Sequence, residues 1–310
     1  MTALGIDLGG TKLSFAVFSQ QGGILYKHTV EVEKRSGKEV GDLIADETQN
    51  LIVSHNIQSI GIAVPGIYHQ TGTVWAPNIK GWDDYPLLQH MQAATNIPVT
   101  IDSDRACYIL GESWKGNAKD CNNAIYLAVG TGIGAGILID GKILRGQHDI
   151  AGAIGWLALQ QPFEEKYISC GCFEHHASGE GIAKVAREIL KKENYNGMLK
   201  QKPSEELTAH DIFAAYEKND KVAKEVFSIC IRFWGMAVAN LVSLFNPGRI
   251  ILGGGVFGPA IQFISAIKDE ATKWAQPISM KQVSIEASAL GNDAGLYGAG
   301  YLALKRVSKV

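Results

Sequence analysis

Short apolar, β-branched runs alternate with segments of helical periodicity along most of the chain. The runs LGIDL and LSFAVF predict a β-hairpin, and GILYKHTVEVE predicts a third strand. VGDLIADETQNLIVSH has helical spacing and leads into the strand SIGIAVPG, while IPVTID precedes a helix through ACYILGESWKG. Strands that alternate with crossover helices predict an α/β fold whose sheet is covered by helices on both faces.

The same hairpin pattern returns in the second half of the chain. AIYLAVGTGIGAGILIDGKIL lies over ALGIDLGGTKLSFAVFSQQGGIL when Ala3 is aligned with Ala124. This repeat predicts two similar domains. The polar, turn-rich stretch KGNAKDCNNA predicts a boundary that gives domains 1–117 and 118–310, and the last helix, about 293–306, is expected to return to the N-terminal domain.

Each hairpin turn is rich in glycine, and a third glycine turn follows later. RIILGGGVFG continues from the strand Arg249–Leu252 and opens a helix at about Pro259. Such turns expose backbone N–H groups that can receive an anion, although one alone is equally a plain tight turn. GTGIGAG joins two strands and lacks an acidic partner about 20 residues on, so it does not indicate a Rossmann site. Three such turns together favour a nucleotide site.

The bulk composition limits the classes of partner. The 310 residues are 46% apolar and 19% charged with a net charge of −2, which is typical of a globular protein and disfavours a nucleic-acid partner. Charged residues interrupt the apolar segment 222–245, which predicts a core helix first and a dimer contact second, not a membrane span. No signal peptide is recognisable, and five cysteines suggest no disulfide framework, so a cytoplasmic protein is expected.

Several motifs resemble those of one known family. GIDLGGTK, AVPG with TGTVWAPN, DSDRACYILGE, AVGTGIGAGILIDGKILRG and GCFEHHASG follow the order and spacing of the ROK family of sugar kinases nearly from end to end. The resemblance implies two similar actin/hexokinase-like (ribonuclease H-like) α/β domains with a cleft between them. A repressor branch carries an added N-terminal DNA-binding domain, for which no room is expected before the first strand.

The same resemblance implies an activity and its cofactors. It implies transfer of the γ-phosphate of ATP, with Mg²⁺, to a sugar primary hydroxyl, with glucose as the expected acceptor. N-acetylmannosamine, N-acetylglucosamine, mannose, fructose and β-glucosides remain open as acceptors. A sugar-sensing protein without turnover and a phosphotransferase acting on a non-sugar are the rival functions.

The resemblance also assigns roles to the glycine turns. The first phosphate turn comprises Asp7, Gly9, Gly10, Thr11 and Lys12, the second comprises Gly130, Thr131 and Gly132, and Gly253, Gly254 and Gly255 lie near the adenosine. The third turn favours ATP over polyphosphate as the phosphoryl donor. Phosphoryl transfer needs mainly positioning and neutralised charge, which these groups can supply. Asp7 is expected to hold Mg²⁺ through water, with a turn-capping role as the alternative.

On the acceptor side, a hydroxyl needs a carboxylate within hydrogen-bond reach to take its proton. The family's base position falls on Asp104, and Asp102 is then expected to be a structural turn or N-cap residue. Ser103 stands where relatives usually have a sugar-binding asparagine. Gly66, Asn78 and Glu174 are the other sugar contacts that the resemblance implies, although Asn78 could equally form an Asx-turn.

One motif departs from the family. Relatives bind a structural Zn²⁺ through one histidine and three cysteines near the sugar, and a nearby glutamate contacts the sugar. In register, this chain has Ala153 at the glutamate, Trp156 at the histidine, and Glu165, Tyr167 and Cys172 at the cysteines. We therefore expect no zinc here and a loop held by packing, with Trp156 filling the vacated volume. Ala153 and Trp156 also suggest altered specificity, including acceptance of a substituted sugar.

Overall fold

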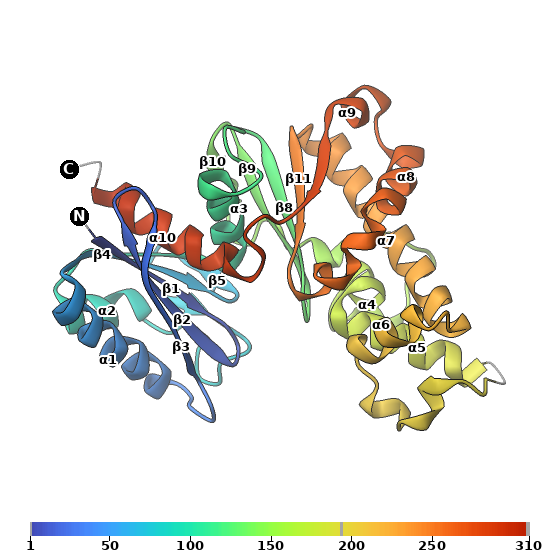
Figure 1. Cartoon of the computed structure of the whole chain (residues 1–310), viewed down its shortest axis with the longest axis horizontal. Coiled ribbons are helices and arrows are strands. Elements are labelled where there is room, and N and C mark those ends of the chain that lie inside the picture. Colours follow the sequence, from blue (N-terminus) through green and yellow to red (C-terminus); the bar gives the residue numbers. More distant parts are fainter. Residues whose placement is uncertain (1, 193–194, 308–310) are drawn as a thin grey trace. The chain divides into compact units, whose positions relative to one another are not determined.

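The computed structural model describes residues 2–192 and 195–307, which form two compact units (Figure 1). Unit 1 comprises Met1–Asp120, Ile143–Ala151 and Asn292–Val310, and unit 2 comprises Cys121–Lys142 and Gly152–Gly291. The first crossing therefore lies after Asp120, three residues beyond the boundary expected from the sequence. The segment Ile143–Ala151 was assigned by sequence to the second domain but packs within unit 1.

Unit 1 is built on a five-stranded mixed sheet in the order β3-β2-β1-β4-β7. β1 pairs antiparallel with β2 and parallel with β4, which pairs parallel with β7. The predicted hairpin and third strand are present. The strands are β1 (Thr2–Leu8), β2 (Lys12–Ser19), β3 (Ile24–Glu31), β4 (Ile57–Val64) and β7 (Val99–Ser103), and a small second sheet pairs β5 (Ile67–Tyr68) with β6 (Val74–Trp75).

Helices cover both faces of this sheet because successive strand residues point to opposite sides. One face buries Leu4, Ile6 and their neighbours in a cluster that includes residues of α1 (Lys38–His55) and α2 (Leu87–Thr95). The other face packs against α3 (Asp104–Lys115) and α10 (Ala294–Val307), which lie side by side. Gly61 of β4 lets α10 approach closely, since a Cβ there would clash with the Ala299 carbonyl oxygen.

Unit 2 repeats the same strand order, β10-β9-β8-β11-β12. Its strands are β8 (Ala124–Val129), β9 (Ile133–Ile139), β10 (Lys142–Ile143), β11 (Arg249–Gly253) and β12 (Ser284–Ala287). Its α-helices are α4 (Cys172–Ala177), α5 (Gly179–Lys192), α6 (Ala209–Glu217), α7 (Lys221–Phe245), α8 (Ile264–Trp274) and α9 (Pro277–Gln282). The third glycine turn leads through two 3₁₀ turns, Gly255–Phe257 and Pro259–Phe263, into α8.

The helix α7 is the long apolar helix predicted from the sequence. It begins after Asp220, whose carboxylate accepts the N–H groups of Val222 and Ala223, and ends where Asn246 adopts a left-handed conformation. Its length and composition alone would suffice to cross a membrane, but 61% of its most apolar window is buried inside the protein. Trp234 and Phe233 of this helix lie in the core of unit 2, so α7 serves there as a core helix.

Candidate active site

Asp104, the predicted base, is the first residue of α3, directly after β7. Ser103 caps the helix by accepting the N–H of Ala106 at 3.3 Å. The Asp104 carboxylate accepts the N–H of Arg105 at 2.7 Å and the hydroxyl of Tyr108 at 3.3 Å. Burial raises the pKa of Asp104, and the positive charge of Arg105 together with these two hydrogen bonds only partly offsets the rise. A held carboxylate with a raised pKa is suited to accept a proton from a hydroxyl.

Asp7 lies at the end of β1, close enough to Asp104 for their charges to interact. Burial, together with the like charges of Asp104 and Asp293, raises the pKa of Asp7 to about 7. Carboxylates that repel one another in this way favour a bound cation. Among residues 2–192 and 195–307, no three His, Cys, Asp or Glu side chains are arranged to ligate an ion directly. A single buried carboxylate such as Asp7 has the chemistry to hold a Mg²⁺ ion through water.

The first glycine turn, Gly9-Gly10-Thr11-Lys12, closes the hairpin between β1 and β2. The Gly9 N–H donates to the Lys12 carbonyl oxygen at 2.8 Å. The Lys12 ammonium lies 3.3 Å from Glu31, and 61% of the lysine side chain is exposed. Such a surface ion pair contributes little free energy, so a phosphate could compete for the lysine. A Cβ added to Gly10 would lie 3.8 Å from Asn78 Cβ, which brings a predicted sugar contact to this turn.

Arg105, the residue after Asp104, links helix α3 to another predicted sugar contact. Its guanidinium donates to the carbonyl oxygen of Gly66 at 3.1 Å. Gly66 has φ +102°, and a Cβ there would collide with the Trp75 carbonyl oxygen, so only glycine fits without strain. The backbone at Gly66 is thus fixed relative to Asp104.

Asp102 has a structural role, but it is not the helix N-cap that we expected as one alternative. The helix N-cap is Ser103, and Asp102 forms a bidentate ion pair with Arg145 of the segment Ile143–Ala151. Arg145 Nη1 donates to Asp102 Oδ1 at 2.7 Å, and the Asp102 side chain is 1% exposed. The pair holds the returning segment against the end of β7, two residues before the base. A contact over 43 residues leaves no local signal in the sequence.

The second and third glycine turns of unit 2 line one cavity of about 880 Å³. Their contributions are Gly130 and Thr131 from the second turn and Gly255 from the third. Gly254 shapes the wall, because it has φ +88° and a Cβ there would lie 2.5 Å from the Val129 carbonyl oxygen. The other glycines of these turns, Gly132 and Gly253, lie against Glu174 and Tyr126.

Much of this cavity comes from segments to which the sequence assigned no functional role. They are the start of α5, the stretch before α6 and the start of α6, with the residues Gly179, Glu180, Ala183, Lys184, Arg187, Glu205, Glu206, Leu207, Thr208, Ala209, His210 and Phe213. The Gly179 N–H donates to the Gly130 carbonyl oxygen at 2.7 Å, which fixes the N-terminus of α5 at the second turn. The cavity thus combines the backbone of two glycine turns with apolar side chains such as Phe213, a lining typical of small-molecule sites.

Glu174 of α4 contacts the second glycine turn. Its carboxylate accepts the N–H of Ile133 at 2.6 Å, and burial raises its pKa. Gly155 lies against the same side chain, since a Cβ there would be 3.0 Å from Glu174 Cβ. The neighbouring Trp156 is 59% exposed, so it does not fill a vacated volume as we expected. Ala153, three residues earlier, precedes the short 3₁₀ turn Ile154–Trp156.

The chain is similar to known proteins over nearly its whole length. The family model described as ROK family matches residues 3–306. A glucokinase of Halalkalibacterium halodurans is 33% identical over 96% of this chain and 94% of its own length. A β-glucoside kinase of Listeria monocytogenes is 28% identical over 97% of each chain. The structure of a ROK family glucokinase from Streptomyces griseus with glucose and AMPPNP has a TM-score of 0.80 at 27% identity, covering 98% and 100% of the two chains. The fold is the actin/hexokinase-like α/β fold.

Proposed function

This chain belongs to the ROK family, and we propose that it is an ATP-dependent hexose kinase that phosphorylates glucose on its primary hydroxyl. The observation that carries this proposal is the environment of the Asp104 carboxylate. This carboxylate has a raised pKa, is held by two donors at the start of α3, and lies near Asp7. Two neighbouring carboxylates whose pKa values are both raised are typical of a catalytic site.

Asp104 takes the proton of the acceptor hydroxyl, and the resulting oxygen attacks the γ-phosphorus in line while the β–γ bridging bond breaks. Gly9, Gly10, Thr11 and Lys12 bind phosphate in unit 1, and Gly130, Thr131 and Gly132 do so in unit 2. When bound, Mg²⁺ held by Asp7 through water would supply neutralising charge to the phosphates. Asn78, Ser103, Glu174 and the backbone at Gly66 orient the sugar.

ATP is the donor that the cavity in unit 2 favours. Polyphosphate needs only charge, whereas this cavity also presents the apolar residues Ala183, Phe213, Val256 and Pro259 beside the glycine turns. Those side chains suit the adenine ring of ATP, whereas polyphosphate has no apolar group that would contact them.

We further propose that the partners are small molecules only, without nucleic acid or membrane, and that the protein is cytoplasmic. Helix α7 is a secondary candidate for a homodimer contact.

A substituted hexose is the second candidate acceptor. Trp156 is 59% exposed and directly follows Gly155, which lies against Glu174. An exposed indole beside a sugar-binding carboxylate can stack on an apolar ring or a second sugar. The similarity to a β-glucoside kinase supports the same class of acceptor. A Trp156→Ala variant should then lose turnover of a β-glucoside and keep turnover of glucose.

The test is ADP release from MgATP across glucose, mannose, fructose, two N-acetylhexosamines and methyl β-glucoside, with the product position assigned by ³¹P NMR. We expect saturable turnover with glucose and a 6-phosphate product. Turnover with the glucoside alone would make Trp156 the specificity determinant. Sugar binding without any turnover would support the sensor, and sugar-independent ADP release would support a phosphotransferase with another acceptor.

A further inference from the structure

The loop before α4 does not fit the structural zinc described above for the relatives. Trp156, at the histidine position, has an exposed side chain, and Glu165 and Tyr167 replace two cysteines. In the part of the chain that the structure describes, no three His, Cys, Asp or Glu side chains could together hold a metal. A lysine ammonium, Lys166, lies within the polar group of this loop, where it would repel a cation.

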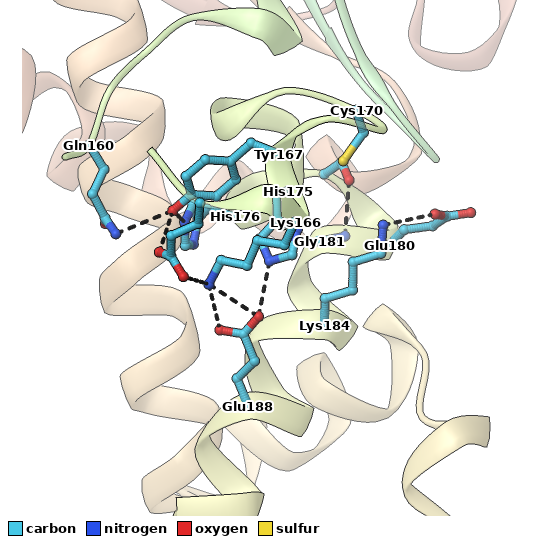
Figure 2. A network of polar contacts seen from close by, with 12 residues as sticks. Gln160, Lys166, Tyr167, Cys170, His175, His176, Glu180, Gly181, Lys184 and Glu188 are labelled. Atoms are coloured by element: carbon cyan, nitrogen blue, oxygen red, sulfur yellow. Dashed lines mark hydrogen bonds and ion pairs between the residues drawn. The ribbon is translucent and has the colours of Figure 1, made fainter. Parts of the chain in front are cut away.

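A hydrogen-bonded group of side chains occupies this region (Figure 2). We call it the Tyr167 cluster: Glu164, Lys166, Tyr167, His175, His176 and Glu188. Its centre is the Tyr167 hydroxyl, which lies 2.9 Å from Glu164 Oε1 and 3.0 Å from His176 Nε2. A phenol has one proton, and the carboxylate is the stronger acceptor, so Tyr167 donates to Glu164 and accepts from His176.

This assignment fixes the state of His176. The ring is 6% exposed, it donates from Nε2, and its Nδ1 has no partner among the described residues. Burial lowers the pKa of His176 to about 4, so the ring is neutral near pH 7. It also stacks on Phe233 of α7 with ring centroids 4.3 Å apart, which ties the cluster to the core of unit 2.

Lys166 supplies the positive charge of the cluster. Its ammonium lies 3.2 Å from Glu164 and 3.1 Å from Glu188, and Glu188 also bonds His175 Nε2 at 3.0 Å. Glu164 and Lys166 belong to the loop, Lys166 within its 3₁₀ turn Glu165–Tyr167. His175 belongs to α4 and Glu188 to α5 (Figure 2). The cluster therefore joins three separate segments, and the Lys166 ammonium lies between its two carboxylates.

Helix α4, which contributes two histidines to this cluster, also carries a predicted site residue. Glu174 directly precedes His175 and His176 in α4, and its carboxylate accepts the Ile133 N–H next to Gly132. We propose that the Tyr167 cluster is a metal-independent brace that positions Glu174, and through it the Gly130–Gly132 turn, for phosphoryl transfer. Tyr167 is thus a positioning residue that acts through Glu174, an inference that rests on the proposed kinase function.

The test is a double-mutant cycle of Tyr167→Phe and Glu174→Gln, measured as kcat/KM for the sugar. Tyr167→Phe removes one oxygen and keeps the ring, so the fold is retained. We expect a loss of about tenfold in the wild-type background and little further loss in Glu174→Gln, because the coupled residues share one effect. Equal losses in both backgrounds would overturn the proposal.

Tyr195→Phe is the matched control. Tyr195 donates its hydroxyl to Asp220 at 2.5 Å, also in unit 2, but neither residue belongs to the cluster. This variant should lower the melting temperature as Tyr167→Phe does, leave kcat/KM unchanged, and show no coupling to Glu174→Gln. A control that loses activity in parallel with Tyr167→Phe would reduce the effect to general stability and contradict the brace.

The zinc content of the purified protein gives a second test that does not depend on enzymatic activity. Elemental analysis of the full chain purified from zinc-supplemented medium should give well under one zinc per chain, and 1,10-phenanthroline should leave the melting temperature unchanged. One tightly bound zinc per chain would contradict the metal-independent brace even if the enzyme phosphorylates glucose. Failure of every sugar to react, with zinc absent, would instead contradict the proposed function alone.

Discussion

The two sheets share one strand order but differ in what their first hairpins carry. In unit 1, β1 contains Asp7, and four residues separate the paired Leu8 and Leu13. In unit 2, the position aligned with Asp7 is Ala128, and three residues separate the paired Val129 and Ile133. The second turn is therefore shorter and uncharged, and the carboxylate that reaches it, Glu174, comes from a helix instead.

The difference shows how one architecture can be used for two tasks. The interacting carboxylates Asp7, Asp104 and Asp293 all belong to unit 1. The large cavity bounded by backbone turns and apolar side chains belongs wholly to unit 2. A duplicated fold provides the same turn twice, and we propose that the side chains after the strands suit the first turn to charge and proton transfer and the second to nucleotide binding.

The largest stability effect should follow loss of the buried ion pair in unit 1. Arg145→Met leaves Asp102, which is 1% exposed, without its partner, and an unpaired buried charge costs about 3–5 kcal/mol. Urea unfolding monitored by tryptophan fluorescence measures the loss. Glu31→Gln is the control, because its pair with Lys12 is more than half exposed and should contribute under about 1 kcal/mol. Equal losses in the two variants would contradict this assignment.

The third glycine turn offers a matched pair of substitutions in unit 2. Gly254→Ala forces φ +88° on alanine and places its Cβ 2.5 Å from the Val129 carbonyl oxygen, so stability should fall by about 1–3 kcal/mol and ATP affinity with it. Gly255→Ala meets no atom within 4 Å and should leave the melting temperature nearly unchanged. Calorimetric melting and ATP titration compare them. A similarly destabilised Gly255→Ala would refute the steric account.

The two units should respond oppositely to pH. The pKa of Asp7, about 7, lies above its usual value of 3.8, so its contribution to stability is full below pH 3.8 and is lost as pH rises through 7. The pKa of His176, about 4, lies below its usual 6.5, so its contribution is full above pH 6.5 and is lost as pH falls toward 4. The histidine shift corresponds to at most ~3 kcal/mol.

Native-state hydrogen exchange, read separately for the two units, measures these opposite slopes. Asp7→Asn should abolish the loss in unit 1 between pH 4 and 7 and raise its stability at pH 8, while leaving the exchange of unit 2 unchanged. If the stability of unit 1 depended on pH in Asp7→Asn as it does in the wild type, Asp7 would ionise normally in the folded chain.

Local patterns were sufficient to predict the hairpins, α3, α7 and the third glycine turn. Alternation and helical spacing are properties of neighbouring residues, and a turn such as Gly253-Gly254-Gly255 limits its own backbone. The repeat pointed to two related sheets because period-two burial and turn chemistry recur even where side chains differ.

The contacts that sequence reasoning missed join distant segments. Asp102 meets Arg145 across 43 residues, and Glu188 meets His175 from another helix. The exposure of Trp156 was also wrongly anticipated, because a loop can be held by hydrogen bonds as well as by packing. Long-range ion pairs depend on tertiary placement, which a single sequence does not encode in any local period.

The measurement that tests the central claim most directly is glucose-dependent turnover by Asp104→Asn beside the wild type, with ATP affinity measured on both. Removing the base should lower kcat by about 10²–10⁴-fold. ATP affinity should stay within about twofold, because the substituted residue and the nucleotide cavity belong to different units. Near-normal turnover by a folded Asp104→Asn would contradict the assignment of proton transfer to unit 1.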